Sequence, residues 1–292
     1  MMNKREFTQI ALSAGADDVR FAPAQGTLAF GEEDCFDIAS RLPGATCIVV
    51  LFASYLPASP GASKGYMPLS AYYPASNRSY FAAKALAEWL REQGGSALHD
   101  TELPARAAAL RTGGFIGDNG FYYHDRFGSY AAIQTILTDA FEPDESASSE
   151  NRCMHCGACA AACPSAAVGD IPRCLRRHIN HEIPETLRGD VYQILGCEKC
   201  QTACPLNPSG YSEPYVFPLE RLISGEATGE LKHLAGSNFV RRGRMQSQVA
   251  LYAATTKQTQ VLPQLIALSQ SAEEPVRTHV LWAIQKLKGE LP

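Results

Sequence analysis

Seven of the ten cysteines in the chain fall in two short stretches, and their spacing constrains the fold more than any other feature. The first stretch, "CMHCGACAAACP", begins at Cys153 and follows the pattern C-x2-C-x2-C-x3-C-P. The second, "CEKCQTACP", begins at Cys197 and is one cysteine shorter. The first pattern is typical of bacterial ferredoxins, in which three cysteines hold one four-iron cluster and the fourth binds the other cluster. The spacing therefore predicts a ferredoxin-like region.

One further cysteine completes the ligand set of two clusters. Cys174, in "PRCLRRHINHE", raises the total in this region to eight, the number that two [4Fe-4S] clusters need. The crossed pattern assigns Cys153, Cys156, Cys159 and Cys204 to the first cluster and Cys163, Cys174, Cys197 and Cys200 to the second. Structural zinc is the alternative for paired C-x2-C motifs. The third closely spaced cysteine, both Cys-Pro endings and the count of eight favour clusters.

Composition and charge are those of an ordinary folded protein. Of 292 residues, 46% are hydrophobic and 19% are charged, which is enough for a normal core. The net charge of −4 gives no global reason to expect a nucleic-acid partner, although a local basic face is compatible with it. The N-terminus lacks a signal-peptide pattern, and "CIVVLFASYL" is about half as long as a membrane span. We expect no membrane partner and a cytoplasmic location, where clustered thiols are metal ligands rather than disulfides.

The first part of the chain predicts a mixed α/β domain. Helical spacing of apolar residues predicts a helix near Phe7, and "ATCIVVLFASYL" predicts a buried strand. A loop is predicted from Leu56 to about Arg78, before an amphipathic helix in "SYFAAKALAEWLREQGG". "LPARAAALRTGG" predicts another helix, and "GGFIGDNGFYYHDRFGSY" predicts strand, tight turn and strand. "AAIQTILTDAFE" is compatible with either a strand or a helix.

The chain is expected to be an α+β protein of three segments. An acidic, serine-rich linker, "EPDESASSEN", precedes the cysteines, and the residues after them have an almost wholly helical pattern. The C-terminal stretch resembles one unit of a HEAT-type helical repeat, which must pack on another surface. We expect an α/β domain in residues 1–145, a two-cluster domain in 146–210 and a helical region in 211–292. Because clusters only carry electrons, the first segment is expected to hold a redox-active cofactor or to dock a redox partner.

Several motifs together resemble the epoxyqueuosine reductase family, cobalamin- and iron–sulfur-dependent enzymes of queuosine biosynthesis in transfer RNA. They are "RCMHCGACAAACPSAAV", "RCLRRHINHEIPETLRGDVYQILGCEKCQTACPLN" and the stretch from "HDTELPARAAALRTGGFIGDNG" to "ILTD". The resemblance covers most of the chain. It implies a cobalamin-binding α/β domain related to reductive dehalogenases, a ferredoxin-like domain and C-terminal HEAT-like helices.

The resemblance also implies individual site residues. Asp100 matches the position of the family's proposed proton donor, whereas its local sequence alone favours a helix N-cap. The implied cobalamin contacts are Gly114, Ile116, Gly117, Asn119, Gly128 and Ser129. Taken alone, such glycines mark turns. None of His99, His124, His178 and His181 is singled out as a cobalt ligand.

The implied reaction is a two-electron removal of an epoxide oxygen from a base in tRNA. Electrons would pass singly from an external one-electron donor through the clusters to cobalamin. Arg176, Arg177, Arg241, Arg242 and Arg244 are candidates for a patch that contacts the tRNA backbone, or are ordinary exposed arginines.

Three departures from the family keep other functions open. "SNRSYFAAKAL" replaces an Asp-Tyr-His-like motif, Asp118 replaces the lysine of a "GxIGKN" turn, and the C-terminal helical region is short. The alternatives are a two-cluster electron-transfer protein without a corrin and a corrinoid reductase that acts on a small molecule.

Overall fold

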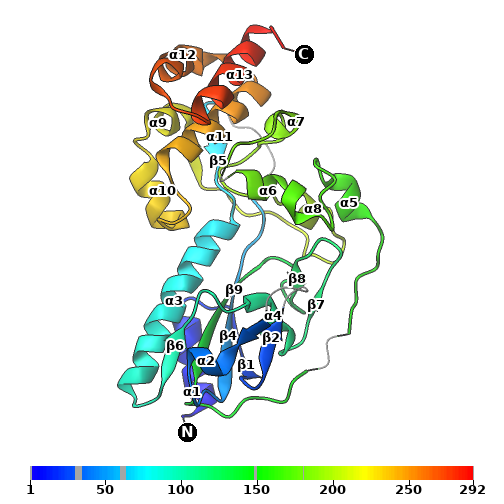
Figure 1. Cartoon of the computed structure of the whole chain (residues 1–292), viewed down its shortest axis with the longest axis vertical. Coiled ribbons are helices and arrows are strands. Elements are labelled where there is room, and N and C mark those ends of the chain that lie inside the picture. The colour runs from blue at the N-terminus through cyan, green and yellow to red at the C-terminus, as the bar shows by residue number, and fades with distance from the viewer. Residues whose placement is uncertain (1, 30–34, 60–63, 148–149, 180, 292) are drawn as a thin grey trace. The chain divides into compact units, whose positions relative to one another are not determined.

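The structure, a computed structural model, describes residues 2–29, 35–59, 64–147, 150–179 and 181–291 (Figure 1). The chain divides into two units, each built from several stretches of sequence. The first unit comprises Met1–Tyr55, Ala75–His155 and Leu206–Pro208, and the second comprises Leu56–Pro74, Cys156–Pro205 and Ser209–Pro292. The expected division into segments 1–145, 146–210 and 211–292 stays a prediction.

A sheet of four antiparallel strands forms the centre of the first unit, in the order β1-β4-β9-β6. The strands are β1 (Asp18–Pro23), β4 (Cys47–Ser54), β9 (Ala131–Thr138) and β6 (Ala97–His99). Every residue of β4 except Ser54 is buried, as expected of a central strand covered on both faces, so the predicted strand is confirmed. The segment that allowed a strand or a helix is strand β9, because its backbone pairs with β4 on one side and β6 on the other.

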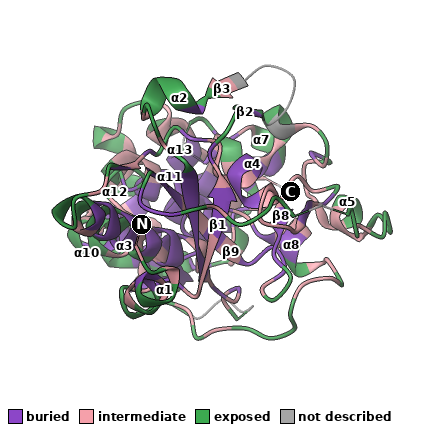
Figure 2. Ribbon diagram, turned by 90° about the horizontal axis from the view of Figure 1, so that it is seen from below, coloured by how far each residue is buried: buried purple, intermediate pink, exposed green. Residues whose placement is uncertain are grey.

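Helices cover both faces of this sheet. They are α1 (Lys4–Ser13), α2 (Ile38–Arg41), α3 (Tyr72–Glu92) and α4 (Ala105–Leu110). Alternate residues of β4 point to opposite faces, so Val49 joins Phe7 of α1 and Leu90 of α3 on one side. Val50 joins Ile38 of α2 on the other side, together with the alanines of α4. Figure 2 shows that α3 is buried along the face that packs on the sheet and exposed along the other.

Two small hairpins complete the first unit. The β2–β3 hairpin pairs Thr27–Ala29 with Cys35–Asp37, and the β7–β8 hairpin pairs Phe115–Ile116 with Tyr122–Tyr123. The second confirms the predicted strand, turn and strand in the glycine-rich segment.

The loop predicted from Leu56 to about Arg78 is wrong in its second half. Strand β5 occupies Tyr66–Pro68, and helix α3 begins at Tyr72. Pro74 lies in the first turn of α3, where its missing N–H group removes no helical hydrogen bond. A proline of the predicted loop therefore lies within the helix.

Short helices carry the cysteine region of the second unit, and longer ones follow. The short elements are α5 (Ala158–Ala162), η1 (Ile171–Arg173), α6 (Leu175–His178), α7 (Glu185–Arg188) and α8 (Lys199–Thr202). The later elements are β10 (Val216–Pro218), α9 (Leu219–Ser224), α10 (Thr228–Ala235), α11 (Arg242–Thr255), η2 (Thr259–Val261), α12 (Leu262–Ser271) and α13 (Val276–Lys288). Strand β10 pairs with β5 in an antiparallel ribbon. The helical C-terminal region is confirmed.

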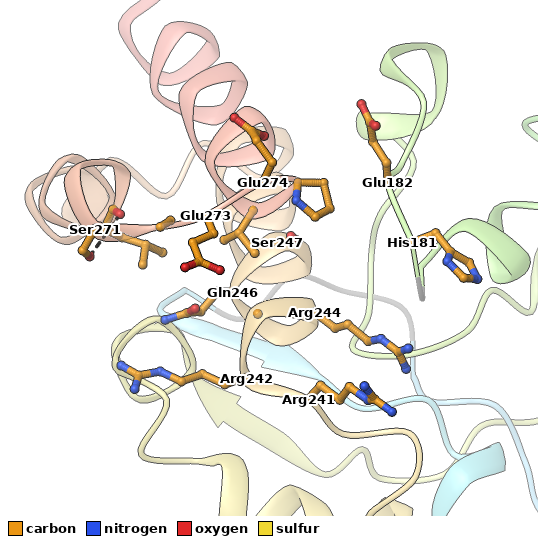
Figure 3. A pocket seen from close by; sticks show the side chains of 15 residues that line it. His181, Glu182, Arg241, Arg242, Arg244, Gln246, Ser247, Ser271, Glu273 and Glu274 are labelled. Carbon is orange, nitrogen blue, oxygen red and sulfur yellow. Dashed lines mark hydrogen bonds between the residues drawn. The ribbon is translucent and has the colours of Figure 1, made fainter.

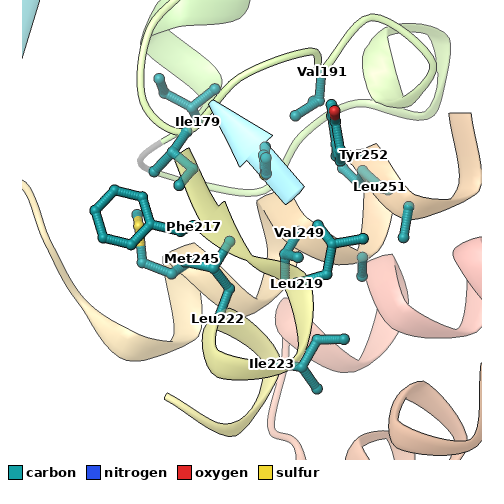
Figure 4. Packing of buried hydrophobic residues seen from close by; sticks show 14 of the residues in the cluster. Ile179, Val191, Phe217, Leu219, Leu222, Ile223, Met245, Val249, Leu251 and Tyr252 are labelled. Atoms are coloured by element: carbon teal, nitrogen blue, oxygen red, sulfur yellow. The ribbon is translucent and has the colours of Figure 1, made fainter. Parts of the chain in front are cut away.

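Helix α11 is the centre of the second unit's core (Figure 4). Its residues from Met245 to Ala254 are all buried, which means that other segments surround it. Two of its polar side chains satisfy buried backbone groups: Gln248 Oε1 accepts the Leu195 N–H at 2.7 Å, and Gln246 Nε2 donates to the Ile223 carbonyl at 2.8 Å. Helices α9 and α13 both pack on α11, so the HEAT-like helices find their packing surface within this unit. Among the described residues, every helix is too short or too polar to span a membrane.

Candidate functional site

Several cysteines of the second unit lie within electrostatic reach of Cys197 and Cys200. Burial, with added contributions from Cys197, Cys174, Cys163 and Cys159, raises the pKa of the Cys200 thiol to about 12. Burial likewise raises the pKa of Cys197 to about 11, with added contributions from Cys174 and Cys163. Cys163, Cys174, Cys197 and Cys200 are the residues that the sequence assigns to the second cluster, and Cys159 is assigned to the first. Converging thiols of this kind suit a metal, because iron replaces their protons and removes the repulsion between neighbouring thiolates.

The loop after Cys163 points donors at its sulfur. Cys163 Sγ accepts a hydrogen bond from the Ala167 N–H at 3.3 Å and lies 3.6 Å from Ser165 Oγ. Burial would raise the pKa of Cys163, but these hydrogen bonds outweigh it and lower the pKa. Hydrogen bonds to ligand sulfurs also tune the potential of an iron–sulfur cluster. The second unit therefore presents a donor set that fits a [4Fe-4S] cluster.

Polar groups between the cysteines fix the second motif. Glu198 lies between Cys197 and Cys200, is 2% exposed, and accepts a hydrogen bond from Ser70 Oγ at 2.6 Å. Its own N–H donates to Tyr192 Oη at 2.7 Å. Burial raises the pKa of Glu198. This buried carboxyl group links the helix that carries Cys200 to the strand β5 segment.

Asp100 lies at the end of β6 with its side chain buried. Its Oδ2 atom accepts a hydrogen bond from Arg41 Nε at 2.6 Å, and its Oδ1 atom accepts one from the Glu102 N–H at 2.9 Å. Helix α4 begins only at Ala105, after Pro104. The N-cap interpretation of Asp100 is therefore wrong, because the carboxylate caps a local turn and pairs with an arginine instead. Arg41 was missed, since nothing in its local sequence connects it to Asp100.

The glycines of the β7–β8 hairpin are required by the packing of two tyrosines. At Gly114, where φ is +78°, a Cβ atom would lie 2.5 Å from the Tyr123 carbonyl oxygen. At Gly117 it would lie 2.7 Å from the Tyr123 ring. Asn119 Nδ2 donates to Tyr123 Oη at 2.9 Å. These contacts, beside the half-buried Ile116, shape the hairpin, and the role of its residues as cobalamin contacts stays a prediction.

Gly128 and Ser129 hold Asn207, three residues beyond Cys204. Ser129 donates its N–H to Asn207 Oδ1 at 2.7 Å, and Asn207 Nδ2 donates to Ser129 Oγ at 2.9 Å. A Cβ atom at Gly128 would collide with Asn207 Oδ1. The pair thus has a structural role in the first unit, and its predicted contact with a corrin stays untested.

Comparisons with known proteins find similarity to iron–sulfur domains and to epoxyqueuosine reductases. Residues 148–168 and 195–213 each match a family described as a 4Fe-4S binding domain. Epoxyqueuosine reductase of Bacillus subtilis is 30% identical over 212 residues, covering 64% of this chain and 54% of the relative. That of Staphylococcus aureus is 29% identical over 213 residues, covering 64% and 55%. The chain is thus similar in sequence to epoxyqueuosine reductases. The matched region of the chain spans about half the length of these curated relatives.

Solved structures show that the epoxyqueuosine reductase fold extends over the whole chain. The enzyme of Streptococcus thermophilus matches with a TM-score of 0.81 at 19% identity, covering 100% of this chain and 92% of that one. An epoxyqueuosine reductase solved with an epoxyqueuosine-modified tRNA-Tyr stem loop matches with a TM-score of 0.78 at 24% identity, covering 97% and 90%. The expected fold is thereby confirmed.

One departure from the epoxyqueuosine reductase pattern has a structural explanation within the first unit. Arg78, in the segment that replaces the family's Asp-Tyr-His-like motif, donates to Asp17 Oδ2 at 2.9 Å. The same oxygen accepts the N–H of Ser54 at 2.7 Å. Arg78 therefore ties α3 to the end of β4.

The histidines and arginines considered from the sequence have varied surroundings. His124 is buried beside Asp18 and Arg20, and His99 Nε2 lies 2.9 Å from Gln134 Oε1. The guanidinium of Arg176 lies over the Tyr72 ring at 4.3 Å. His124 is therefore a core residue.

Three of the candidate arginines line one cavity of the second unit (Figure 3). Arg241, Arg242 and Arg244 come from the start of α11, and the cavity has a volume of about 930 Å³. Glu273 and Glu274, before α13, line its opposite wall. Arg242 also donates to the Ser224 carbonyl at 2.8 Å. The three arginines thus lie at the N-terminus of α11, a helix end that itself favours anions, and three glutamates, Glu182, Glu273 and Glu274, line the rest of the cavity.

Proposed function

We propose that this protein is an iron–sulfur, cobalamin-dependent reductase that converts epoxyqueuosine to queuosine in tRNA. The carrying observation is the convergence of Cys163, Cys174, Cys197 and Cys200 within a chain that has the epoxyqueuosine reductase fold. The reaction consumes two electrons and two protons, and it converts an epoxide into an alkene and water. The eight cysteines would hold the two clusters, which accept electrons singly from an external donor.

Cobalamin, when bound, supplies a strongly reducing cobalt centre for the attack on the epoxide. The residues proposed to hold it are Gly114, Ile116, Gly117, Asn119, Gly128 and Ser129. Tyr122, Tyr123 and Asn207 fill the space beside Gly114, Gly117 and Gly128, so the support for these contacts is the resemblance of the motifs to the family. The first cluster is proposed to be held by Cys153, Cys156, Cys159 and Cys204.

Asp100 is proposed to deliver a proton to the departing epoxide oxygen. It is the last residue before the turn that leads into α4, and Arg41 and the Glu102 N–H hold its two oxygens. A structure of the Bacillus subtilis epoxyqueuosine reductase has its catalytic aspartate loop swung out of the active site. Proton transfer requires Asp100 to carry a proton and to lie within hydrogen-bond reach of the departing oxygen, so the Arg41–Asp100 pair must open first.

The tRNA contact is proposed to include the arginine cavity at the start of α11. The overall charge of −4 opposes binding to a polyanion, so any affinity must come from a local concentration of cations. Arg241 and Arg244 supply it next to a helix N-terminus. A related epoxyqueuosine reductase has been solved with a modified tRNA stem loop. The proposed location is the cytoplasm.

Anaerobic reconstitution tests the function. The protein is loaded with iron, sulfide and cobalamin, desalted and analysed for metals, then incubated with a reductant and epoxyqueuosine-containing tRNA. We expect about eight irons and one cobalt per chain, and queuosine in the digested tRNA. Eight irons without cobalt would instead identify a two-cluster electron carrier. Retained cobalt without turnover of the tRNA would favour a reductase of small molecules.

A further inference from the structure

The β7–β8 hairpin touches the segment that enters the first cysteine motif. Within the first unit, the carboxylate oxygens of Asp118 lie 2.9 and 3.1 Å from His155 Nδ1. The guanidinium of Arg152 lies over the ring of Phe115, 5.5 Å from its centre. The turn of the hairpin and its first strand therefore both hold the residues that flank Cys153.

Cys153 lies beside the Asp118–His155 pair. A carboxylate oxygen of Asp118, a ring nitrogen of His155 and the Cys153 sulfur all lie within 4.8 Å of one another. The Cys153 N–H donates to Asn151 Oδ1 at 2.9 Å. The position and direction of this thiol are thus set by the short loop around it and by what that loop contacts.

The backbone at His155 needs outside support. Its φ of +50° lies in the left-handed region, which is unfavourable for a residue with a side chain. Such conformations persist when surrounding contacts impose them. The contact with Asp118 is the side-chain interaction that holds this residue.

The pair also explains an unusual residue choice. Asp118 occupies the position of the lysine in the family's "GxIGKN" turn. A lysine ammonium has only donors and is unable to accept the N–H of His155 Nδ1, whereas a carboxylate accepts it readily. The charge reversal at this position therefore fits the histidine inside the first cysteine motif.

We propose that Asp118 is a positioning residue for the first cluster. Through His155 it holds the loop that carries Cys153 in the conformation that presents this thiol to iron. The inference rests on the proposed assignment of Cys153 to that cluster. The competing interpretation is a mononuclear metal ion bound by Asp118, Cys153 and His155, since these three ligand types also suit zinc.

The rate at which a chelator removes iron tests the proposal without cobalamin or tRNA. Wild type, Asp118→Ala, Asp118→Asn and the matched control Glu92→Ala, an exposed carboxylate on α3, are reconstituted and mixed with a ferrous chelator. Loss of a group that orients a metal ligand typically weakens metal binding by about 10–100-fold. We therefore expect half of the iron in Asp118→Ala to be released about tenfold faster or more, with the other half unchanged. Asp118→Asn, whose side-chain oxygen still accepts an N–H group, should lie between Asp118→Ala and wild type.

The outcomes separate this proposal from the proposed function. Wild type that never holds eight irons would refute the two-cluster assignment itself. Wild type with eight irons, and equal release from Asp118→Ala, would overturn only the role of Asp118. Stoichiometric zinc in wild type that is lost in Asp118→Ala would establish the mononuclear site instead. A circular dichroism spectrum and melting temperature equal to those of Glu92→Ala exclude general unfolding as the cause of faster release.

Discussion

At the scale of single residues, Asp100 has the most specific surroundings. Asp100 is buried, and its carboxylate pairs with Arg41. Because a buried ion pair costs desolvation free energy, the presence of this pair calls for a functional reason. Proton donation is that reason in the proposed reaction. The Arg41–Asp100 pair would then keep the carboxylate in place while the site is empty, and the surrounding turn would control its release.

Replacement of Asp100 tests its role as the acid. Asp100→Asn keeps the shape and should lower the single-turnover rate about 10²–10⁴-fold, the usual contribution of a general acid. Iron and cobalt content should stay equal to wild type, which limits the defect to the chemical step. Glu102→Gln is the matched control, because Glu102 also pairs with Arg41, at 3.0 Å, and is exposed. Equal rates for Asp100→Asn and Glu102→Gln would remove Asp100 from the mechanism.

Asp18 gives a prediction for pH. Burial would raise its pKa, but hydrogen bonds from His124 and Arg20 outweigh burial and lower the pKa to about 2. A lowered pKa in the folded protein means that the carboxylate stabilises the fold above its unfolded pKa near 4. That stabilisation, about 2 kcal/mol, is lost as the pH falls toward 2.

The comparison of Asp18→Asn with wild type isolates this effect. At pH 7 the free energy of unfolding of the variant, measured in urea, should be about 2 kcal/mol lower than that of wild type. This difference between the two proteins should shrink steadily between pH 4 and pH 3. Acid also removes iron, but both proteins share that loss and it cancels in the difference. A difference that stays constant across this range would show that Asp18 is not held as the structure indicates.

At the scale of elements, the β7–β8 hairpin depends on glycine at one position and tolerates change at another. A side chain at Gly114 would meet the Tyr123 backbone, which is unable to move without breaking the strand pair. Gly120 has a similar positive φ of +74° but open space around its Cα. The two positions therefore share the cost of a left-handed backbone and differ only in the steric overlap.

This contrast predicts that Gly114→Ala destabilises the protein more than Gly120→Ala. The extra cost is that of overpacking, about 1–3 kcal/mol, and it should appear as a lower melting temperature of the iron-loaded protein. Equal melting temperatures for the two variants would show that Tyr122 and Tyr123 yield to the added methyl group.

The elements also show which parts of the fold the sequence predicts and why it does not predict the others. The cysteine motifs, the β4 strand and the β7–β8 hairpin are encoded by neighbouring residues, and local patterns predicted them. The β9 strand was ambiguous because its apolar residues fit both periods, and only pairing with β4 and β6 decides. Pairs such as Arg41 with Asp100 and Ser129 with Asn207 join residues far apart in sequence. Neither partner has a local feature that identifies the other.

At the scale of the whole molecule, charge distribution restricts how an acidic protein binds tRNA. The chain carries 26 lysines and arginines against 30 aspartates and glutamates, so long-range attraction to a polyanion is weak. Binding must then depend on few contacts, and the arginines at the start of α11 are the candidates. Few contacts also mean a shallow dependence of affinity on salt, because each neutralised phosphate releases about one counterion.

Salt titrations of tRNA binding by wild type and by Arg241→Ala test that argument. The logarithm of the association constant should fall linearly with the logarithm of the salt concentration, and Arg241→Ala should reduce the slope by about one. Its effect should be the same on tRNA with and without the epoxide, since a backbone contact does not read the base. Arg91→Ala, in the last turn of α3 where Arg91 bonds to the Ala97 carbonyl, is the matched control and should leave the slope unchanged. An unchanged slope for Arg241→Ala would exclude Arg241 from the contact.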